Sequence, residues 1–138
     1  MSHYIVLVAD EARARFFMTQ SRTGALTEID ALVNPDARLR EQDLVSDSRG
    51  GNPHDIGNHG EVHARIADSF AKQVGQSLGK AVAKYRPDSI HVAAAPRFLG
   101  MLRKHWSDGI QSDITQELPK DLTQLSPDQV RAHLPEYL

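Results

Sequence analysis

One short segment of this chain has the residue types of an anion-binding site. Residues 89–94 are predicted to form a short buried strand that runs straight into a helix, and Pro96 suits the first helical position. Ala95 stands at the capping position but offers no side-chain acceptor, so the backbone N–H groups of Arg97 and Phe98 need a partner from elsewhere. A cation at this end of a helix, with donors unfilled, predicts that Arg97 and Phe98 bind an anion. The alternative is a surface ion pair between Arg97 and a carboxylate.

Two further arginines are predicted to face one side of a sheet. Arg13 and Arg15 are two residues apart in an expected strand, so their side chains point the same way. With Arg38, Arg40 and Arg49 they form a candidate basic surface for phosphates. The acidic total charge and the lack of interleaved aromatic residues weaken that interpretation, and a salt-bridged surface is the favoured alternative.

Three histidines are candidate metal ligands. His54, His59 and His63 lie close together in the sequence, and in a helix that begins near residue 58 the last two stand one turn apart on one face. Their spacing, with Asp55 nearby, suits a loose zinc or nickel site. A solvated, histidine-rich loop is the favoured alternative.

Other signals for catalysis are weak. Asp10 ends the first expected strand, where a ribonuclease H-like nuclease carries a metal-binding carboxylate, but the strand at 89–94 offers His91 and alanines where a further Asp is required. We therefore interpret Asp10 as a turn residue. Gly50-Gly51 is a faint phosphate-loop signal, and there is no Walker loop, dinucleotide glycine pattern or nucleophile elbow, so we expect no cofactor.

Composition limits the class of protein. The 138 residues suffice for one domain, which we expect to span 1–138. Lys and Arg number 16 against 18 for Asp and Glu, so any binding to nucleic acid must come from a local patch. The absence of cysteine excludes disulfides and thiolate chemistry. No apolar run is long enough for a bilayer and no secretory signal opens the sequence, so we expect a cytoplasmic protein without membrane insertion.

The elements that position these residues follow from hydrophobic periodicity. We expect three strands joined by short turns, then a mobile loop at about 46–60, then a long helix, and afterwards two more strands alternating with helices. The expected strands are 4–9, 13–19, 26–33, 89–94 and 114–118, and the last helix begins at the capping signal Ser126-Pro127-Asp128-Gln129.

The long helix has its own signals. Asn58 and Glu61 have the spacing of a capping box at its start, and Pro87 ends it. Apolar residues recur every four positions from Val62 to Val82. Gly75 and Gly79 cost helix propensity, so we expect both to be explained by close packing.

This order of elements predicts the α/β class. A meander followed by βαβ units gives a mixed five-stranded sheet, antiparallel on one side and parallel on the other, with helices on its faces. That is the ribonuclease H-like arrangement.

Four blocks of sequence resemble one bacterial family. VADEARARFF at 8–17, NPDAR at 34–38 with DLVSD at 43–47, APRFLG at 95–100 and KDLT at 120–123 resemble, in order, the host-attachment family, described as proteins required for attachment to host cells. The resemblance implies a fold similar to the middle domain of eukaryotic and archaeal peptide-chain release factors. In release factors that domain carries a Gly-Gly-Gln tip for peptidyl-tRNA hydrolysis, and this chain has Gly50, Gly51 and Asn52 in its long loop.

We therefore expect a non-enzymatic module that binds an anionic partner, RNA or the ribosome, through Arg97 and the surface at the strand ends. One alternative is an accessory or interaction protein that supports attachment indirectly. Another is a hydrolase that acts on RNA or peptidyl-tRNA through the loop at 50–52. The sequence leaves the oligomeric state and the partner open.

Overall fold

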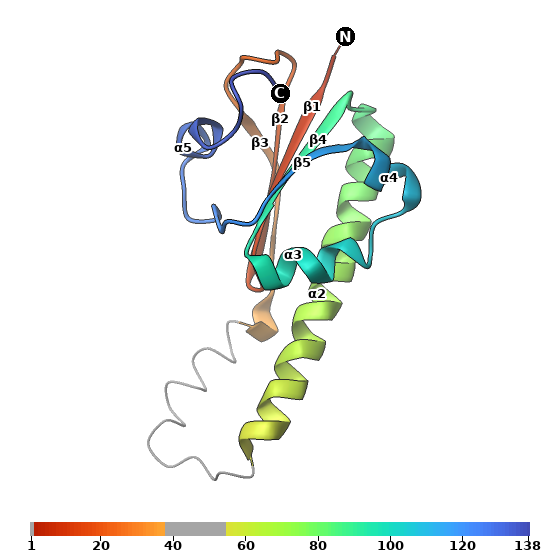
Figure 1. Cartoon of the computed structure of the whole chain (residues 1–138), viewed down its shortest axis with the longest axis vertical. Coiled ribbons are helices and arrows are strands. Elements are labelled where there is room, and N and C mark those ends of the chain that lie inside the picture. Colours follow the sequence, from red (N-terminus) through yellow and green to blue (C-terminus); the bar gives the residue numbers. More distant parts are fainter. Residues whose placement is uncertain (1, 38–54) are drawn as a thin grey trace.

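Five strands form one mixed sheet, as the order of elements predicts (Figure 1). The computed structural model of the chain describes residues 2–37 and 55–138. The strands are β1 (Tyr4–Ala9), β2 (Arg13–Thr19), β3 (Thr27–Val33), β4 (Ser89–Ala94) and β5 (Ile114–Leu118), in the spatial order β3-β2-β1-β4-β5. β1 pairs antiparallel with β2 and parallel with β4, and β4 pairs parallel with β5. The predicted fold class is confirmed.

The central strand β1 is buried along its whole length, because its unbroken apolar run presents hydrophobic side chains to both faces of the sheet. Ile5 and Leu7 belong to the core on one face, and Val6 and Val8 to the core on the other. Each face therefore needs a cover of its own.

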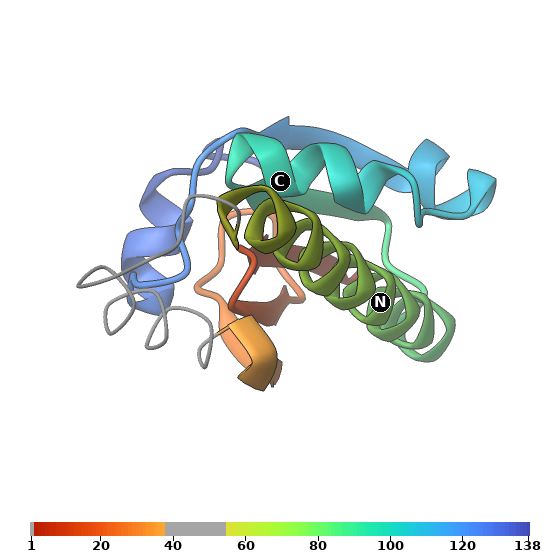
Figure 2. The ribbon, with the colours of Figure 1, turned by 90° about the horizontal axis from the view of Figure 1, so that it is seen from below.

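Helices cover the first face. α2 (Asp55–Tyr85), α3 (Pro96–Arg103) and α4 (Asp108–Asp113) all lie on this side. Figure 2 shows α3 lying beside α2, where the rings of Phe70 and Phe98 stack with centroids 6.0 Å apart. Figure 1 shows that α2, which has 31 residues, runs well past the lower end of the sheet.

The start of α2 differs from the prediction. The helix begins at Asp55, so residues 55–60 of the expected mobile loop are helical and Asn58 lies inside the helix rather than at its cap. The capping-box prediction for Asn58 and Glu61 was wrong, because that spacing recurs inside helices. The end agrees with the prediction, since Tyr85 is the last helical residue. Arg86 follows at φ 47°, a left-handed conformation, and Pro87 prevents continuation.

The two glycines of α2 have different neighbours. A Cβ on Gly75 would lie 3.1 Å from the carbonyl oxygen of His105, in the connection between α3 and α4, so close approach explains this glycine. A Cβ on Gly79 would meet the tip of Ile110 at an ordinary 3.9 Å. The prediction of close packing is confirmed for Gly75 and wrong for Gly79.

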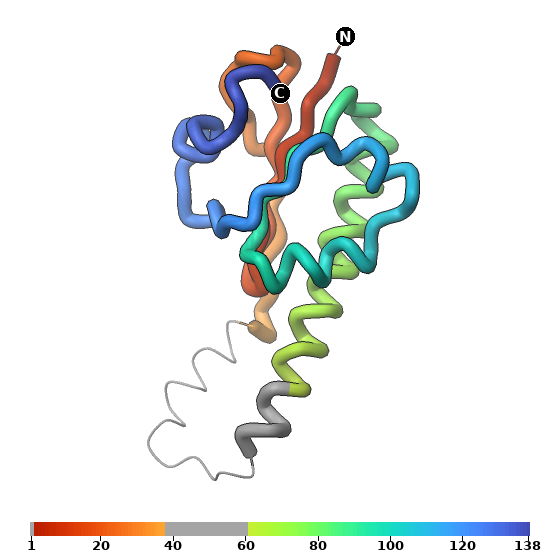
Figure 3. Tube along the Cα trace, in the orientation of Figure 1, coloured from red at the N-terminus to blue at the C-terminus, as the bar shows by residue number. Residues whose placement is uncertain are grey.

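The second face is covered by the C-terminal segment, which we define as residues 119–138. Figure 3 shows this stretch as a mostly irregular course, broken by the short helix α5 (Pro127–Ala132). The predicted capping box is present, with the Ser126 hydroxyl and the Gln129 side chain each accepting a backbone N–H. Leu122 and Val130 from this segment pack on Val6, Val8 and Phe17.

Arg131 fixes the far part of this segment. Its guanidinium donates to four backbone carbonyls, those of Arg22, Gly24, Pro135 and Glu136, at 2.7–3.1 Å. Two of these carbonyls lie in the turn between β2 and β3 and two lie beyond α5. One side chain therefore joins the segment to the sheet. No helix in the described part of the chain is long and apolar enough to cross a membrane.

The first prediction compares the two glycines. Gly79→Ala should raise the free energy of unfolding by about 1 kcal/mol, because alanine favours the helix and the added methyl has room. Gly75→Ala should lower it by roughly 1–3 kcal/mol, because backbone atoms of His105 stand in the way. Denaturant titrations of both variants check this. If Gly75→Ala proved as stable as Gly79→Ala, the close approach would be wrong.

The second prediction concerns Arg131. Arg131→Lys should destabilise the protein by about 2 kcal/mol, since one ammonium cannot reach four carbonyls in different directions. The matched control is Arg103→Lys, because among the described residues the Arg103 guanidinium bonds to the Glu117 carboxylate alone, in an exposed hydrogen bond. Equal stability losses in the two variants would contradict the role of Arg131.

Candidate functional site

The carboxyl ends of β1, β4 and β5 meet at the lower end of the sheet (Figure 1). Asp10 follows β1, α3 begins after β4, and the C-terminal segment follows β5. Ligands of open α/β sheets commonly bind at this end of parallel strands. The predicted anion site therefore lies at the edge of the sheet where the segments that follow β1, β4 and β5 begin.

Arg97 lies at the start of α3 and its side chain is exposed. It forms neither a hydrogen bond nor a salt bridge with any described residue, so the predicted alternative of a surface ion pair is not seen there. Ala95 provides no side-chain cap, and the first helical bond runs from the Leu99 N–H to the Ala95 carbonyl. The N–H groups of Arg97 and Phe98 precede that bond and have no acceptor within the described ranges. Phe98 is buried as a whole residue, so neither its ring nor its N–H is exposed to an outside anion, and the prediction is left with Arg97.

The Arg15 side chain is bonded to other parts of the protein. Its guanidinium donates to the Glu28 carboxylate at 2.7 Å and to the backbone carbonyls of Thr123 and Leu125 at 3.1 and 2.5 Å, and it lies over the ring of Phe17. The salt-bridged alternative describes Arg15 correctly, and the guanidinium has little capacity left for an outside anion. Sequence reasoning placed Arg15 on a shared face with Arg13 but could not foresee partners more than 100 residues away.

Arg13 is half-buried beside two carboxylates. Its side chain forms no hydrogen bond with a described residue, and its charge acts on Asp121. Of the four predicted anion-binding residues, Arg97 alone is exposed to solvent. Phe98 is buried, Arg13 acts on Asp121, and Arg15 is held by its partners.

A buried hydroxyl joins the two acids. The Thr123 hydroxyl lies 2.6 Å from Asp121 Oδ1 and 3.1 Å from Asp10 Oδ2, and it has one proton to donate. The Thr123 N–H donates to Asp121 Oδ1, and the N–H groups of Ala12 and Arg13 donate to Asp10 Oδ1. Asp10 is thus the turn residue that the sequence indicates, and it also holds the C-terminal segment. Neither Asp121 nor Thr123 carried a signal of its own outside the KDLT block.

The surroundings of Asp10 and Asp121 shift the pKa values of the two carboxyl groups in opposite directions. Burial raises the pKa of Asp10 above its ordinary 3.8, and the adjacent Asp121 carboxyl raises it further against the two N–H bonds. Burial also raises the pKa of Asp121, but the Thr123 bonds, Asp10 and the charge of Arg13 outweigh it and hold that pKa below 3.8. The cluster therefore favours one protonated and one ionised carboxyl in acid.

The metal candidates are only partly visible. His54 lies outside the described residues, and His59 falls in the first turns of α2, where side chains are not described. His63 Nε2 lies 2.5 Å from Glu11 Oε2, a contact that joins α2 to the β1–β2 turn. The described residues contain no group of three metal-binding side chains. Gly50, Gly51 and Asn52 also lie outside the described residues.

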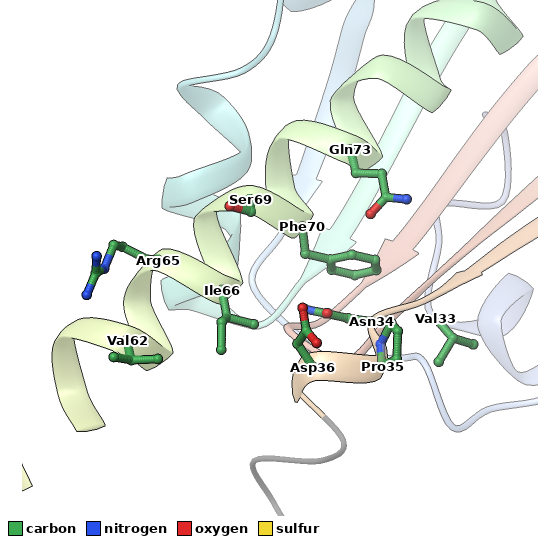
Figure 4. Close-up of a pocket in the computed structure, with 10 residues that line it drawn as sticks. All are labelled: Val33, Asn34, Pro35, Asp36, Val62, Arg65, Ile66, Ser69, Phe70 and Gln73. Atoms are coloured by element: carbon green, nitrogen blue, oxygen red, sulfur yellow. The ribbon is translucent and has the colours of Figure 1, made fainter. Parts of the chain in front are cut away.

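A groove of about 750 Å³ lies beside this end of the sheet, between α2 and residues 33–36 (Figure 4). Its wall mixes apolar and polar side chains, including Ile66, Phe70 and the exposed Val33 with Asn34 and Asp36. Figure 4 shows Arg65 pointing away from the other residues of the groove. The groove offers contact area but no concentration of one charge.

Comparisons with known proteins agree with the fold. The model of a family described as "Protein required for attachment to host cells" matches residues 5–134. Among solved structures, archaeal translation termination factor aRF1 superposes with a TM-score of 0.56 at 10% identity, over 97% of this chain and 35% of that protein. The Ppx/GppA phosphatase of Aquifex aeolicus superposes less well, with a TM-score of 0.45 at 10% identity, over 86% of this chain and 35% of that one. No curated protein matches.

The third prediction follows from the acid cluster. Thr123→Val removes the hydroxyl bond to Asp121, so the pKa of Asp121 should rise towards 3.8, which a ¹³C NMR titration of the aspartate carboxyls measures. Apparent values belong to the Asp10–Asp121 pair, so both resonances are followed. Thr27→Val, on the exposed strand β3, is the control.

The pKa shifts of Asp10 and Asp121 also determine how the free energy of unfolding changes with pH. The folded pKa of Asp121 is lowered, so its ionised form stabilises the fold above pH 3.8 and that contribution is lost as the pH falls through the folded pKa. The folded pKa of Asp10 is raised, so protonation of Asp10 favours the fold as the pH falls towards 3.8. Asp121→Asn should therefore flatten the loss of stability below pH 3.8. If the stability of Asp121→Asn fell below pH 3.8 as steeply as that of the unchanged protein, the stabilising role of ionised Asp121 would be contradicted.

Proposed function

The chain belongs to the family of proteins required for attachment to host cells, and we propose that it is a non-enzymatic module that binds RNA or the ribosome. The binding surface is the carboxyl end of the sheet around Arg97. The protein acts inside the cell, where those partners are.

The observation that carries the proposal is the state of Arg97. Its guanidinium is exposed and has no partner among the described residues, while the Arg97 N–H at the helix start has no acceptor there. A phosphate oxygen fits both needs, because it accepts from this amide and neutralises the cation. The positive end of the α3 dipole adds to this attraction.

The rest of the molecule sets the strength of such binding. The net charge is −2, so the protein as a whole does not attract polyanions. Asp10 and Asp121 stand near Arg13 and reduce the positive potential there. Contact with only a few phosphates implies weak binding that salt reduces with a shallow slope.

RNA is the first partner to test because the fold is shared with a translation termination factor. That likeness concerns the backbone alone, at 10% identity. The second candidate starts from the family description, as an accessory or interaction protein that supports attachment indirectly. The mixed groove between α2 and residues 33–36 favours it, since that surface suits a protein partner rather than a phosphate backbone.

The fourth prediction tests RNA binding. Purified protein should co-sediment with ribosomes at low salt, lose part of that binding after a moderate salt increase, and lose most of it in Arg97→Ala. One lost phosphate contact lowers affinity by roughly tenfold and reduces the salt slope by about one.

Lys72→Ala is the matched control, because Lys72 is exposed on α2 and lies outside the surface around Arg97. Equal loss in the two variants would indicate non-specific attraction and contradict the proposed surface. Absence of co-sedimentation at low salt would reject RNA or ribosome binding and leave the interaction protein as the explanation.

A further inference from the structure

A cavity of about 580 Å³ lies at the opposite end of the sheet from Arg97. It opens on the face that carries the C-terminal segment, near the amino ends of β1 and β4. Its volume falls within the roughly 300–1,000 Å³ of small-molecule sites. The residues that line it come mainly from β1, β4 and β5, from the β2–β3 turn and from the C-terminal segment, and include Tyr4, Arg22, Asp88, His91, Gln116 and Tyr137.

Its lining includes buried polar groups with unused hydrogen-bonding capacity. His91 and Ser89 are 4% and 6% exposed, and His91 Nε2 lies 3.4 Å from the Ser89 hydroxyl and 3.3 Å from that of Thr115. His91 Nδ1 and Gln116 Oε1 form no hydrogen bond of good geometry with any described residue. The two residues are paired in the β4–β5 register, and the Gln116 side chain acts on His91 as a hydrogen-bond partner. Buried polar atoms whose hydrogen bonds are poorly formed destabilise a fold, so these side chains gain if a bound group at the cavity completes their bonding.

The mouth of the cavity has a fixed arginine. The Arg22 side chain donates through Nε to the Tyr4 hydroxyl at 3.1 Å. The Arg22 carbonyl accepts from Arg131 and from the Leu138 N–H, so the backbone of this residue is held in place. The terminal nitrogens of Arg22 donate to no described residue and remain available at the mouth.

The charges around the cavity balance. Arg22 and Asp88 have opposite signs and interact with each other, and both are exposed at the mouth. Burial lowers the pKa of His91, a hydrogen bond with the Gln116 side chain raises it, and the charge of Arg131 lowers it again. The net result is a pKa below the ordinary 6.5, so the imidazole is neutral near neutral pH. A neutral imidazole offers one donor and one acceptor. The lining thus pairs donors with acceptors and has no excess charge.

We propose that this cavity binds a small neutral polyhydroxylated ligand, a monosaccharide. Hydroxyl groups both donate and accept, so they match the mixed set formed by His91, Gln116 and the Ser89 and Thr115 hydroxyls. Arg22 and Asp88 bind further hydroxyls at the mouth. The Tyr137 ring, 65% exposed at the rim, offers an apolar face to the C–H groups of a sugar ring.

The charge balance also argues against an anion at this place. A phosphate near Arg22 would lie near Asp88 as well and would lose much of the attraction. The cavity therefore differs in chemistry from the surface around Arg97, and the inference stands whether or not that surface binds RNA.

The experiment uses NMR of the full chain with uniform ¹⁵N labelling. Glucose, galactose, mannose and ribose are added separately at millimolar concentrations, and inorganic phosphate is the anionic probe. At least one sugar should shift the resonances of Ser89, His91, Thr115 and Gln116 in a saturable way, whereas phosphate should not. No saturable shift with any of the four sugars, or the same shifts with phosphate, would overturn the proposal.

Variants separate the site from general effects. Arg22→Gln and Asp88→Asn change exposed side chains and should each weaken sugar binding about threefold to tenfold, while His91→Leu should weaken it at least tenfold. The exposed pair keeps the test valid if His91→Leu fails to fold. Lys72→Gln, on the other face, is the control and should bind the sugar normally. Unchanged affinity in both exposed variants would also overturn the proposal.

Discussion

The fold depends on covering a sheet that is apolar on both faces. β1 is buried along its length, and its alternate side chains enter two separate cores. Helices cover one face with their own backbone hydrogen bonds already made. The other face is covered by a mostly irregular segment whose carbonyls need donors from elsewhere. Arg15 of β2 donates to carbonyls in the first part of the segment, Arg131 donates to carbonyls in its last part, and the Thr123 hydroxyl adds a bond to Asp10.

This division gives the two ends of the sheet different chemistry. At the carboxyl ends, a helix start without a side-chain cap carries an exposed arginine. At the amino ends, a cavity with polar walls lies over β4 and β5 beside the C-terminal segment. The proposed anion surface is centred on one helix start, whereas the cavity is lined mainly by side chains from three strands, the β2–β3 turn and the C-terminal segment.

Local signals predicted the elements well. The apolar run at Tyr4–Ala9, Pro96 after a buried strand and the Ser126 box each act within a few residues, so their outcome does not depend on the rest of the fold. The start of α2 was misplaced because the Asn58–Glu61 spacing is also compatible with a helix interior. The partners of Arg15 and Arg131 were not predictable, since they are backbone carbonyls distant in sequence, which have no residue-type signature. The sequence showed only that His91 stands where a nuclease would carry an Asp. Its place in the cavity was not predictable, because its burial and its contact with Gln116 depend on the pairing of β4 with β5.

The overhang of α2 has a consequence for cooperativity. Residues 61–66 contribute to the His63–Glu11 pair and to the open groove with residues 33–36, and among the described residues none of them belongs to the main core. Further along, Ala71 and Val74 are fully buried in the main core. The helix therefore belongs to two units of different stability, and its first turns can unwind without global unfolding. A partner that enters the groove would shift that local equilibrium and leave the sheet and its two covers unchanged.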